Sequence, residues 1–470
     1  MVRALRFRPG KNLDLFCCLI VLGLVASVHA DPKPLTKEEQ EKVDKAIDKG
    51  VAFLKRVQHD KGDWPLYRGA YPLGQTLLTA YALLESGVPA GDPSIQKAAN
   101  YVRPSVLKSE RTYEVSLGLL FLDRLGDPRD KTLIRSLALR LIAGQHVTGG
   151  WNYRCPTLSK QSEESLSKAL AELNKGLEVG EKSQAELVKG LELPHALRAL
   201  AVFRDPRKLP WHDPPGSEKN SRQTVFVGTT DNSNTQFAML GLWAAQRHEL
   251  PVGPSFRLMV ERFERTQVAN GWWPYSFDSK GDLAYVKRRP SMLCVGLLGL
   301  GIGCGLQLPT PGASQPKGEN SRVLIGLAAL SQDLGVAAGG REDPNTMRGA
   351  YYLWSVERVA MLYDLPMIGD KDWYRWGAGI IVAAQQPGGE WPNVLVNGKD
   401  HIGPAGDKRP VIDSSLALLF LKRSHPMKEL TAKLPLRGKK LNQGVARLLS
   451  GAPPPEPSTD TPSRSDKPKR

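Results

Sequence analysis

Two kinds of apolar segment alternate along the chain. In one kind nearly every position is apolar, with many Ala, Leu and Gly residues, while in the other the apolar positions recur at helical spacing among charged ones. A helix that is apolar all round must be buried on most faces, whereas a striped helix covers a core from outside. The pattern predicts inner helices at residues 74–85, 113–125, 235–246, 291–302, 350–363 and 414–422, and outer helices at 37–57, 93–102, 130–144, 255–266, 321–333 and 372–384.

A short pattern, Gln-x-x-x-Gly-x-Trp, follows four of these helical stretches. A glycine at this place can end a helix in the left-handed conformation. The tryptophan can stack on the glutamine amide, which can bond backbone groups at a neighbouring helix end. Four identical spacings of scarce residues indicate a repeat protein. The copies are Gln58/Gly62/Trp64, Gln145/Gly149/Trp151, Gln267/Gly271/Trp273 and Gln385/Gly389/Trp391.

The first copy extends upstream as Lys49-Gly50-x-x-Phe53-Leu54. With this extension it matches the QW motif of squalene–hopene cyclases in full, while the other three copies keep only part of the upstream half. The chain therefore resembles the terpenoid cyclase and protein prenyltransferase superfamily over roughly residues 36–425. The resemblance implies an all-α fold, an α6/α6 toroid of six inner and six outer helices.

Several segments depart from the repeat. Residues 157–192 are rich in Lys, Glu, Ser and Leu, with leucines on one helical face, and predict a helical insert. Residues 306–320 and 335–347 have the Gly, Pro, Ser and Asn content of loops. Residues 426–450 are expected to form a helical extension, and residues 451–470 have too little apolar content to fold.

The first thirty residues have the features of a secretory signal. A basic start is followed by an apolar run from Leu15 to Val28, and small residues allow cleavage near Ala30. An uncleaved anchor is the alternative, for which the run is short. The sequence thus predicts an exported protein, periplasmic or extracellular.

The formal net charge is +16, of which residues 1–30 contribute +3 from four basic residues and one acid, leaving +13. Such a charge favours contact with an anionic membrane or polymer. Because no zinc-finger spacing or RNA-binding motif stands out, no nucleic-acid partner is expected. Three cysteines remain after the signal, Cys155, Cys294 and Cys304, an odd number that does not suggest a disulfide framework.

The amino ends of parallel inner helices would meet at one mouth of the ring, where unpaired N–H groups favour anions or carboxylates. Squalene–hopene cyclases carry Asp-x-Asp-Asp-Thr at such a helix start, and its middle aspartic acid protonates an alkene, which demands a strong acid. Here Asp231 and Thr235 match, but Ser233 takes the middle place and Asn234 the next. The resemblance therefore argues against that chemistry, and Asp231 and Asn234 either cap the helix or bind a ligand.

The resemblance to prenyltransferases raises the question of zinc, which those enzymes hold with Asp, Cys and His. Cys294 opens an inner helix, but Met292 stands where the paired aspartate should be, and no histidine starts a later inner helix. Neither a metal nor another cofactor is expected.

Carbohydrate chemistry is a further alternative, because residues 267–274 resemble loops of some pectate lyases. Glycosidases need two positioned carboxylates. A carboxylate inside an apolar helix needs an ion-pair partner or a functional purpose, and aromatic residues there either form core or stack on a ligand. The catalytic candidates are Glu114, Asp231, Glu357 and Asp413, and the ligand-binding candidates are Asn234, Tyr351, Trp354 and Arg358.

Taken together, these patterns predict an exported toroid that binds an elongated lipid-like or saccharide ligand in its central cavity, or that acts as a scaffold. Two alternatives stay open: a terpenoid cyclase or isomerase with a displaced acid, and a polysaccharide lyase or glycoside hydrolase. The fold does not choose among them, because function depends on the site.

Overall fold

A computed structural model describes residues 34–66, 71–179, 184–204, 230–277, 289–306, 321–335, 349–392 and 410–451. The predicted signal segment lies outside these residues. So do the segments 306–320, 335–347 and 451–470, except for the first residue of each.

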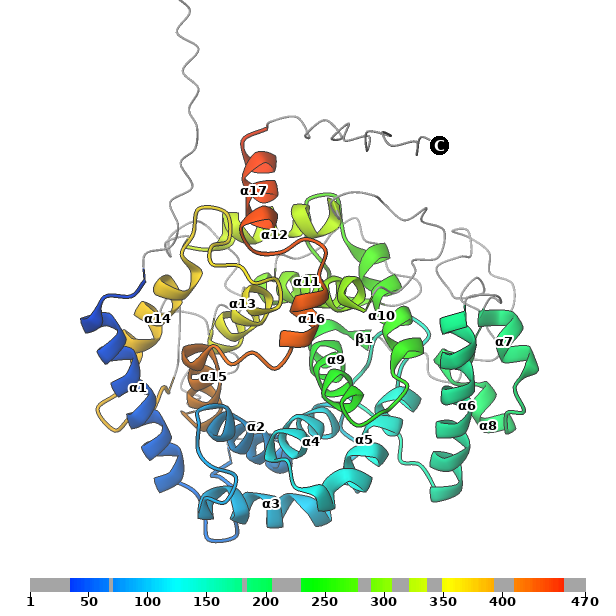
Figure 1. The fold of residues 1–470 in the computed structure, drawn as a ribbon. Coiled ribbons are helices and arrows are strands. Elements are labelled where there is room, and N and C mark those ends of the chain that lie inside the picture. The colour runs from blue at the N-terminus through cyan, green and yellow to red at the C-terminus, as the bar shows by residue number, and fades with distance from the viewer. Residues whose placement is uncertain are drawn as a thin grey trace, which may run out of the picture. The chain divides into compact units, whose positions relative to one another are not determined.

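Within the described part of the chain, six apolar helices contact one another in a closed cycle (Figure 1). Helix α2 contacts α4, and the contacts continue through α9, α11, α13 and α15 back to α2. The predicted all-helical toroid is therefore confirmed. The bounds of these inner helices are Pro72–Glu85 (α2), Thr112–Leu125 (α4), Asn232–Gln246 (α9), Pro290–Gly305 (α11), Ala350–Leu362 (α13) and Pro410–Lys422 (α15).

The striped helices pack against the outside of this cycle, and each of them contacts at least one inner helix. Their first turns often begin at a capping side chain: Asp92 accepts a hydrogen bond from the backbone N–H of Ser94, and Asp372 from that of Arg375. The outer helices are Lys37–Arg56 (α1), Pro93–Val106 (α3), Lys131–Ala143 (α5), Gly253–Thr266 (α10), Ser321–Asp333 (α12) and Trp373–Ala384 (α14).

Shorter elements complete the described chain. The stretch expected to be an insert contains α6 and α7, and α6 contacts both α5 and α10. After α15, α16 contacts α11 and α13, and α17 contacts α12. No helix of the described ranges is long and apolar enough to cross a membrane. The bounds are Pro128–Asp130 (η1), Lys160–Val179 (α6), Gln184–Gly190 (α7), His195–Arg198 (α8), Ala201–Phe203 (η2), Lys428–Lys433 (α16) and Gly438–Leu449 (α17), with strand Thr230–Asp231 (β1) paired antiparallel to Ser276–Phe277 (β2).

The four glutamines of the repeated pattern connect successive outer helices by hydrogen bonds. Each Nε2 donates to the carbonyl of its own glycine and to a second carbonyl in another outer helix. The pattern thereby joins α1 to α3, α5 to α10, α10 to α12 and α14 to α1. The second bonds are Gln58 to Ser94, Gln145 to Ser255, Gln267 to Arg322 and Gln385 to Ala46, each 2.9 Å.

The glycines of the pattern do not end the helices, so that part of the sequence prediction is wrong. Helix α14 ends at Ala384, and Gly389 follows it in a turn, where its backbone N–H donates to the Gln386 carbonyl at 2.9 Å. The expected left-handed conformation is present, with φ of +94° at Gly389. A Cβ there would lie 2.4 Å from the Lys49 carbonyl oxygen of α1. The glycine therefore permits close approach of the turn to the next outer helix.

The tryptophans of the pattern are buried under these junctions, each 0% exposed. Each indole N–H donates to the carbonyl ten residues earlier, near the end of the preceding outer helix, and so satisfies a carbonyl that the helix leaves unpaired. This backbone bond is a role that the sequence did not predict, while stacking on the glutamine amide stays a prediction. The bonds are Trp64 to Leu54 and Trp273 to Phe263 at 2.8 Å, and Trp151 to Leu141 and Trp391 to Ile381 at 2.7 Å.

The repeated pattern is absent at the junction between α3 and α5, where side-chain ion pairs form the connection instead. Arg103 on α3 donates to Asp130 Oδ1 at 2.7 Å and to Asp127 Oδ2 at 2.8 Å. The side chains of Asp130 and Arg103 are 3% and 20% exposed, so the carboxylate is shielded from water and the guanidinium is partly accessible. At this junction the ion pairs of Arg103 therefore replace the glutamine hydrogen bonds.

Candidate functional site

Asp231 begins α9 and caps it with both carboxylate oxygens. Oδ1 accepts from the backbone N–H of Asn234 and from the Ser233 hydroxyl, and Oδ2 accepts from the Asn234 side chain, all at 2.7 Å. Asp231 is 4% exposed. These contacts fit the capping interpretation of Asp231 and Asn234.

Ser233, which stands at the place of the cyclase acid, belongs to a network of hydroxyl groups. Its Oγ lies 2.6 Å from the Tyr113 hydroxyl and 3.4 Å from that of Tyr275, which in turn lies 2.9 Å from the Tyr153 hydroxyl. Because Ser233 gives its one proton to Asp231, Tyr113 must be a donor to Ser233. Burial raises the pKa of Tyr113 well above 10, which keeps that hydroxyl protonated.

Glu114 ties two inner helices together. Its Oε1 accepts from the backbone N–H of Gly74 in the first turn of α2 at 3.2 Å, and its Oε2 accepts from the Ser109 hydroxyl. A carboxylate at a helix start complements the positive partial charge there. The remaining candidate near an inner-helix start, Asp413, lies partly buried in the first turn of α15.

Glu357 and Arg358 form a buried ion pair on α13. Two bonds of 2.5 Å join Glu357 Oε1 to Arg358 Nη2 and Glu357 Oε2 to Arg358 Nε. Burial raises the pKa of Glu357 from 4.5 to about 7, although the Arg358 charge acts to lower it. The ion-pair interpretation of Glu357 fits this geometry, and its partner is the adjacent residue.

An aromatic cluster lies between the start of α9 and the interior of the ring. Phe237 stacks on Trp354 with ring centroids 5.4 Å apart and on Tyr351 at 6.4 Å, and the Tyr113 ring meets Phe237 edge-on at 5.1 Å. Trp354 is 2% exposed, and its indole N–H has no hydrogen-bond partner among the described residues. Leaving a buried donor without a hydrogen-bond partner is energetically costly.

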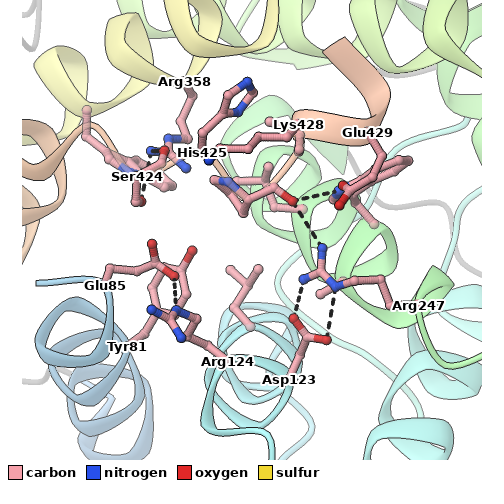
Figure 2. A pocket seen from close by; sticks show the side chains of 17 residues that line it. Tyr81, Glu85, Asp123, Arg124, Arg247, Arg358, Ser424, His425, Lys428 and Glu429 are labelled. Carbon is pink, nitrogen blue, oxygen red and sulfur yellow. Dashed lines mark hydrogen bonds and ion pairs between the residues drawn. The ribbon is translucent and has the colours of Figure 1, made fainter. Parts of the chain in front are cut away.

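A cavity of about 610 Å³, with Trp354 among its lining residues, lies near the carboxyl ends of the inner helices (Figure 2). Late residues of α2, α4 and α9 face it together with the middle of α13, and the segment between α15 and α16 forms a wall. Its lining residues are Tyr81, Glu85, Leu120, Asp123, Arg124, Leu240, Trp243, Ala244, Arg247, Trp354, Arg358, Ser424, His425, Pro426, Met427, Lys428 and Glu429.

Charged pairs border the cavity. Arg124 Nε donates to Glu85 Oε1 at 2.8 Å, and Arg247 binds Asp123 through both Nε and Nη2 (Figure 2). The side chains of Glu85 and Asp123 are only 6% and 11% exposed. Cations are favourable here because the carboxyl ends of helices carry negative partial charge.

Two arginines hold the wall segment in place. Arg358 Nη2 donates to the Ser424 carbonyl at 2.5 Å, and Arg247 Nη1 donates to the Pro426 carbonyl at 3.1 Å. Between them, His425 Nδ1 has no partner among the described residues. Burial lowers the pKa of His425, and the charges of Arg358 and Lys428 lower it further, so the imidazole stays neutral at pH 7.

The residues of the repeated pattern take no part in this cavity. None of them is among its lining residues, and the side chains of the four tryptophans are completely shielded from solvent. Their hydrogen bonds to helix carbonyls fit the predicted structural role, as does the burial of the turn glycine. The residues concerned are Trp64, Trp151, Trp273 and Trp391, with Gly389.

Trp354 and Arg358 are the predicted site residues that line this cavity, and Glu357 lies behind it through its bond to Arg358. Sequence reasoning concentrated on the helix starts and missed Glu85, Asp123 and Arg247. The signal available was a charged residue in the last turn of an otherwise apolar helix, which ordinary helix ends also show.

The described residues contain no group of three or more His, Cys, Asp or Glu side chains that could hold a metal ion.

No protein-family model and no curated protein sequence matches the chain. Similar solved structures include two variants of the type II terpene cyclase MstE from Scytonema. The one in complex with its substrate geranylgeranyl dihydroxybenzoate is 10% identical, covers 83% of this chain and 100% of its own, and has a TM-score of 0.42. The one in complex with its product merosterolic acid A is 13% identical, covers 84% and 100%, and also has a TM-score of 0.42.

A protein from Actinoplanes is 15% identical, covers 81% of this chain and 98% of its own, and has a TM-score of 0.28. These similarities concern the arrangement of helices and not what the chain binds. Within its described residues, the chain has a closed helical toroid fold.

Proposed function

We propose that this protein binds a small neutral saccharide in the cavity at the carboxyl ends of its inner helices. The observation that carries the proposal is the lining: aromatic side chains beside paired acidic and basic ones, around about 610 Å³. Ligand pockets commonly have volumes of roughly 300–1,000 Å³. Export, as residues 1–30 predict, would bring the cavity into contact with sugars outside the cytoplasm.

A saccharide suits this lining better than an elongated lipid does. A sugar ring presents C–H groups that can stack on Trp243 or Trp354, and hydroxyls that both donate and accept hydrogen bonds. Carboxylates such as Asp123 accept from hydroxyls, and guanidinium groups such as Arg247 donate to them. An apolar chain would instead remove water from these charges without replacing its hydrogen bonds.

The balance of charge favours a neutral ligand. Four basic residues line the cavity, and three acidic ones oppose them. Because the charges are largely paired with one another, a charged ligand would have to separate existing pairs. The basic residues are Arg124, Arg247, Arg358 and Lys428, and the acidic ones are Glu85, Asp123 and Glu429.

The contacts favour binding over the two catalytic alternatives. Both oxygens of Asp231 are engaged in capping α9, which leaves little to support its use as a displaced acid. In the cavity, Glu85 and Asp123 each accept from an arginine. A glycosidase needs two carboxyl groups that are free to reach the glycosidic bond, and both of these are held in ion pairs with arginines.

Calorimetric titration of the purified chain with glucose, N-acetylglucosamine, maltose and cellobiose tests the proposal. We expect at least one sugar to bind with a Kd of about 1 mM or tighter. Trp354→Phe, which replaces the indole at the cavity wall with a smaller ring, should weaken binding about 10-fold by reducing stacking on the sugar. Trp376→Phe on α14 is the matched control, because Trp376 does not line the cavity.

Failure of all four sugars to bind would overturn the proposal, as would equal affinity of wild type and Trp354→Phe. Recovery of a fatty acid or isoprenoid with the native protein would replace the saccharide with a lipid ligand.

A further inference from the structure

We infer that the opposite mouth of the ring carries a separate binding surface for acidic saccharides. It consists of Tyr71, Arg111, Tyr153, Tyr275 and Arg289, here called the tyrosine–arginine strip. Arg111 immediately precedes α4, and Arg289 immediately precedes α11. The strip shares no residue with the cavity at the carboxyl ends.

The two arginines of the strip lie against aromatic rings. The Arg111 Cζ atom is 3.9 Å from the centroid of the Tyr71 ring, and the Arg289 Cζ atom is 4.4 Å from that of Tyr275. A guanidinium stacked in this way is fixed in orientation and keeps its N–H edge for a planar anion.

Neither arginine forms an ion pair with a carboxylate in the described part of the chain, in contrast to Arg103, Arg124 and Arg358. The Nε atom of Arg289 is buried and has no hydrogen-bond partner there. A buried donor on a cation that lacks a counter-ion is unfavourable until an acceptor binds. Arg111 is exposed and also lacks a carboxylate partner among the described residues, so two cations without a counter-ion on one surface point to an anionic ligand.

Tyr153 supplies an exposed aromatic face beside these cations. It is 47% exposed, yet its hydroxyl is fixed 2.9 Å from that of Tyr275. Its carbonyl accepts from the backbone N–H of Thr112 at 3.2 Å, which places Tyr153 next to the start of α4. A rigid exposed ring is well suited to stack on the face of a sugar.

The local electrostatics favour an anion as well. The starts of α4 and α11 carry positive partial charge, which falls off within the first turn. Nearby, Asp231 is buried and capping α9, and the exposed Glu110 lies 3.6 Å from Arg154. The acids in this region are therefore already engaged, and Arg111 and Arg289 remain for a ligand.

These features together describe a uronate-bearing oligosaccharide. Its carboxylate would accept paired hydrogen bonds from a guanidinium, and its ring would stack on Tyr153. Its hydroxyls would exchange hydrogen bonds with the tyrosine hydroxyls. This chemistry differs from that of the cavity, where the charges are paired and a neutral sugar is expected.

Titration with trigalacturonate and with its fully methyl-esterified form tests the inference, because esterification removes the charge and leaves the sugar rings unchanged. We expect the acid to bind at least 10-fold more tightly than the ester, and more weakly as the salt concentration rises. Arg111→Gln combined with Arg289→Gln should reduce binding of the acid at least 10-fold, and Tyr153→Ala should also weaken it.

Arg129→Gln, which removes an exposed arginine outside the strip, and Trp354→Phe in the cavity should leave trigalacturonate binding unchanged. Circular dichroism and Tm should show that all variants are folded. Equal binding of acid and ester, or wild-type affinity in the double arginine variant, would overturn the inference. Binding of a sulfated trisaccharide but not of trigalacturonate would overturn the assignment to uronates. Loss of neutral-sugar binding in Trp354→Phe alone would concern the cavity and not the strip.

Discussion

Glu357 and Arg358, adjacent in sequence on α13, form a two-bond ion pair that is almost completely removed from water. Their side chains are 0% and 2% exposed, and the bonds between them are 2.5 Å long. Arg358 also donates to the Ser424 carbonyl, so the pair connects the core of the ring to the wall of the cavity. Burying two charges is unfavourable unless each satisfies the other.

Removing one member of this pair should be more harmful than removing both. At pH 8, we expect Glu357→Leu to lower the free energy of unfolding by about 3–5 kcal/mol, because Arg358 keeps a buried charge without its partner. The double variant Glu357→Leu/Arg358→Met should lose less than the single one. Urea unfolding followed by circular dichroism measures both, and a double variant less stable than Glu357→Leu would contradict the expectation.

The raised pKa of Glu357 should make stability fall as pH rises. Because burial raises this pKa from 4.5 to about 7, the folded chain keeps a proton between these values that the unfolded chain has released. The contribution is fully present below pH 4.5 and lost as pH passes 7, with a size on the order of 3 kcal/mol. Glu85 and Arg423 also act on this carboxyl group.

Urea unfolding at pH 5 and pH 8 measures this contribution. Glu357→Gln cannot titrate, so its stability should decrease less between the two pH values than that of wild type. Identical pH dependence in the two proteins would assign the effect to other groups.

Alanine substitutions at Gly62 and Gly87 distinguish the stability cost of a strained backbone from that of a steric clash. Both have positive φ, +97° and +96°. A Cβ at Gly62 would lie 2.2 Å from the Lys97 carbonyl oxygen, whereas a Cβ at Gly87 would meet nothing within 4 Å. Gly87→Ala should therefore cost only about 1–2 kcal/mol for the left-handed backbone.

Gly62→Ala should cost clearly more, because the Lys97 carbonyl belongs to α3 and cannot move alone. Thermal unfolding of both variants measures the difference. Equal losses at the two positions would mean that the repeat glycines are required for conformation alone and not for close packing of the outer helices.

The repeat glutamines should differ in importance according to their burial. Gln145 is 5% exposed and bonds Gly149 at 3.0 Å and Ser255 at 2.9 Å, and it also accepts from the Ser255 hydroxyl. Gln145→Ala should cost about 2–3 kcal/mol, because buried carbonyls lose their partner. Gln267 is partly exposed and its bond to Gly271 is 3.3 Å, so Gln267→Ala should cost about 1 kcal/mol. Chemical unfolding of the two variants compares them, and the reverse order would refute the burial argument.

Helix positions were largely predictable from the chain because burial leaves a direct mark on composition. The run at 291–302, apolar all round, predicts an inner helix, and α11 spans Pro290–Gly305 with nearly every residue buried. Only the packing explains why this helix contains glycines: a Cβ at Gly299 would lie 2.1 Å from the Phe263 ring of α10.

The position of the repeated pattern after the outer helices was predicted correctly, but the structural roles of its glycine and tryptophan were not. It follows the outer helices as expected, yet Gly389 lies in a turn beyond α14 and does not end it. Likewise the Trp391 indole donates to the Ile381 carbonyl, a bond that spacing alone does not reveal. Both contacts depend on how the turn folds back over the helix, which the short pattern does not encode.

The candidate site was predicted less well. Asp231 stood out because a motif surrounds it, and its contacts are those of a cap. Asp123 and Arg247 belong to no local motif, because they are 124 residues apart and come into contact only when the ring closes. No local pattern records such a pair, since each partner alone resembles an ordinary charged residue at a helix end.

The order of residues along the chain was enough to specify which segments are helical, which are buried and roughly where they stop, because periodicity, capping and glycine conformation act over a few neighbouring positions. The tertiary structure alone decided which ends of those helices enclose space and which side chains meet there. Trp354 and Arg358 lie on α13, and Arg247 directly follows α9, far away in the sequence. Their common cavity exists because α2, α4, α9 and α13 are closed into one ring.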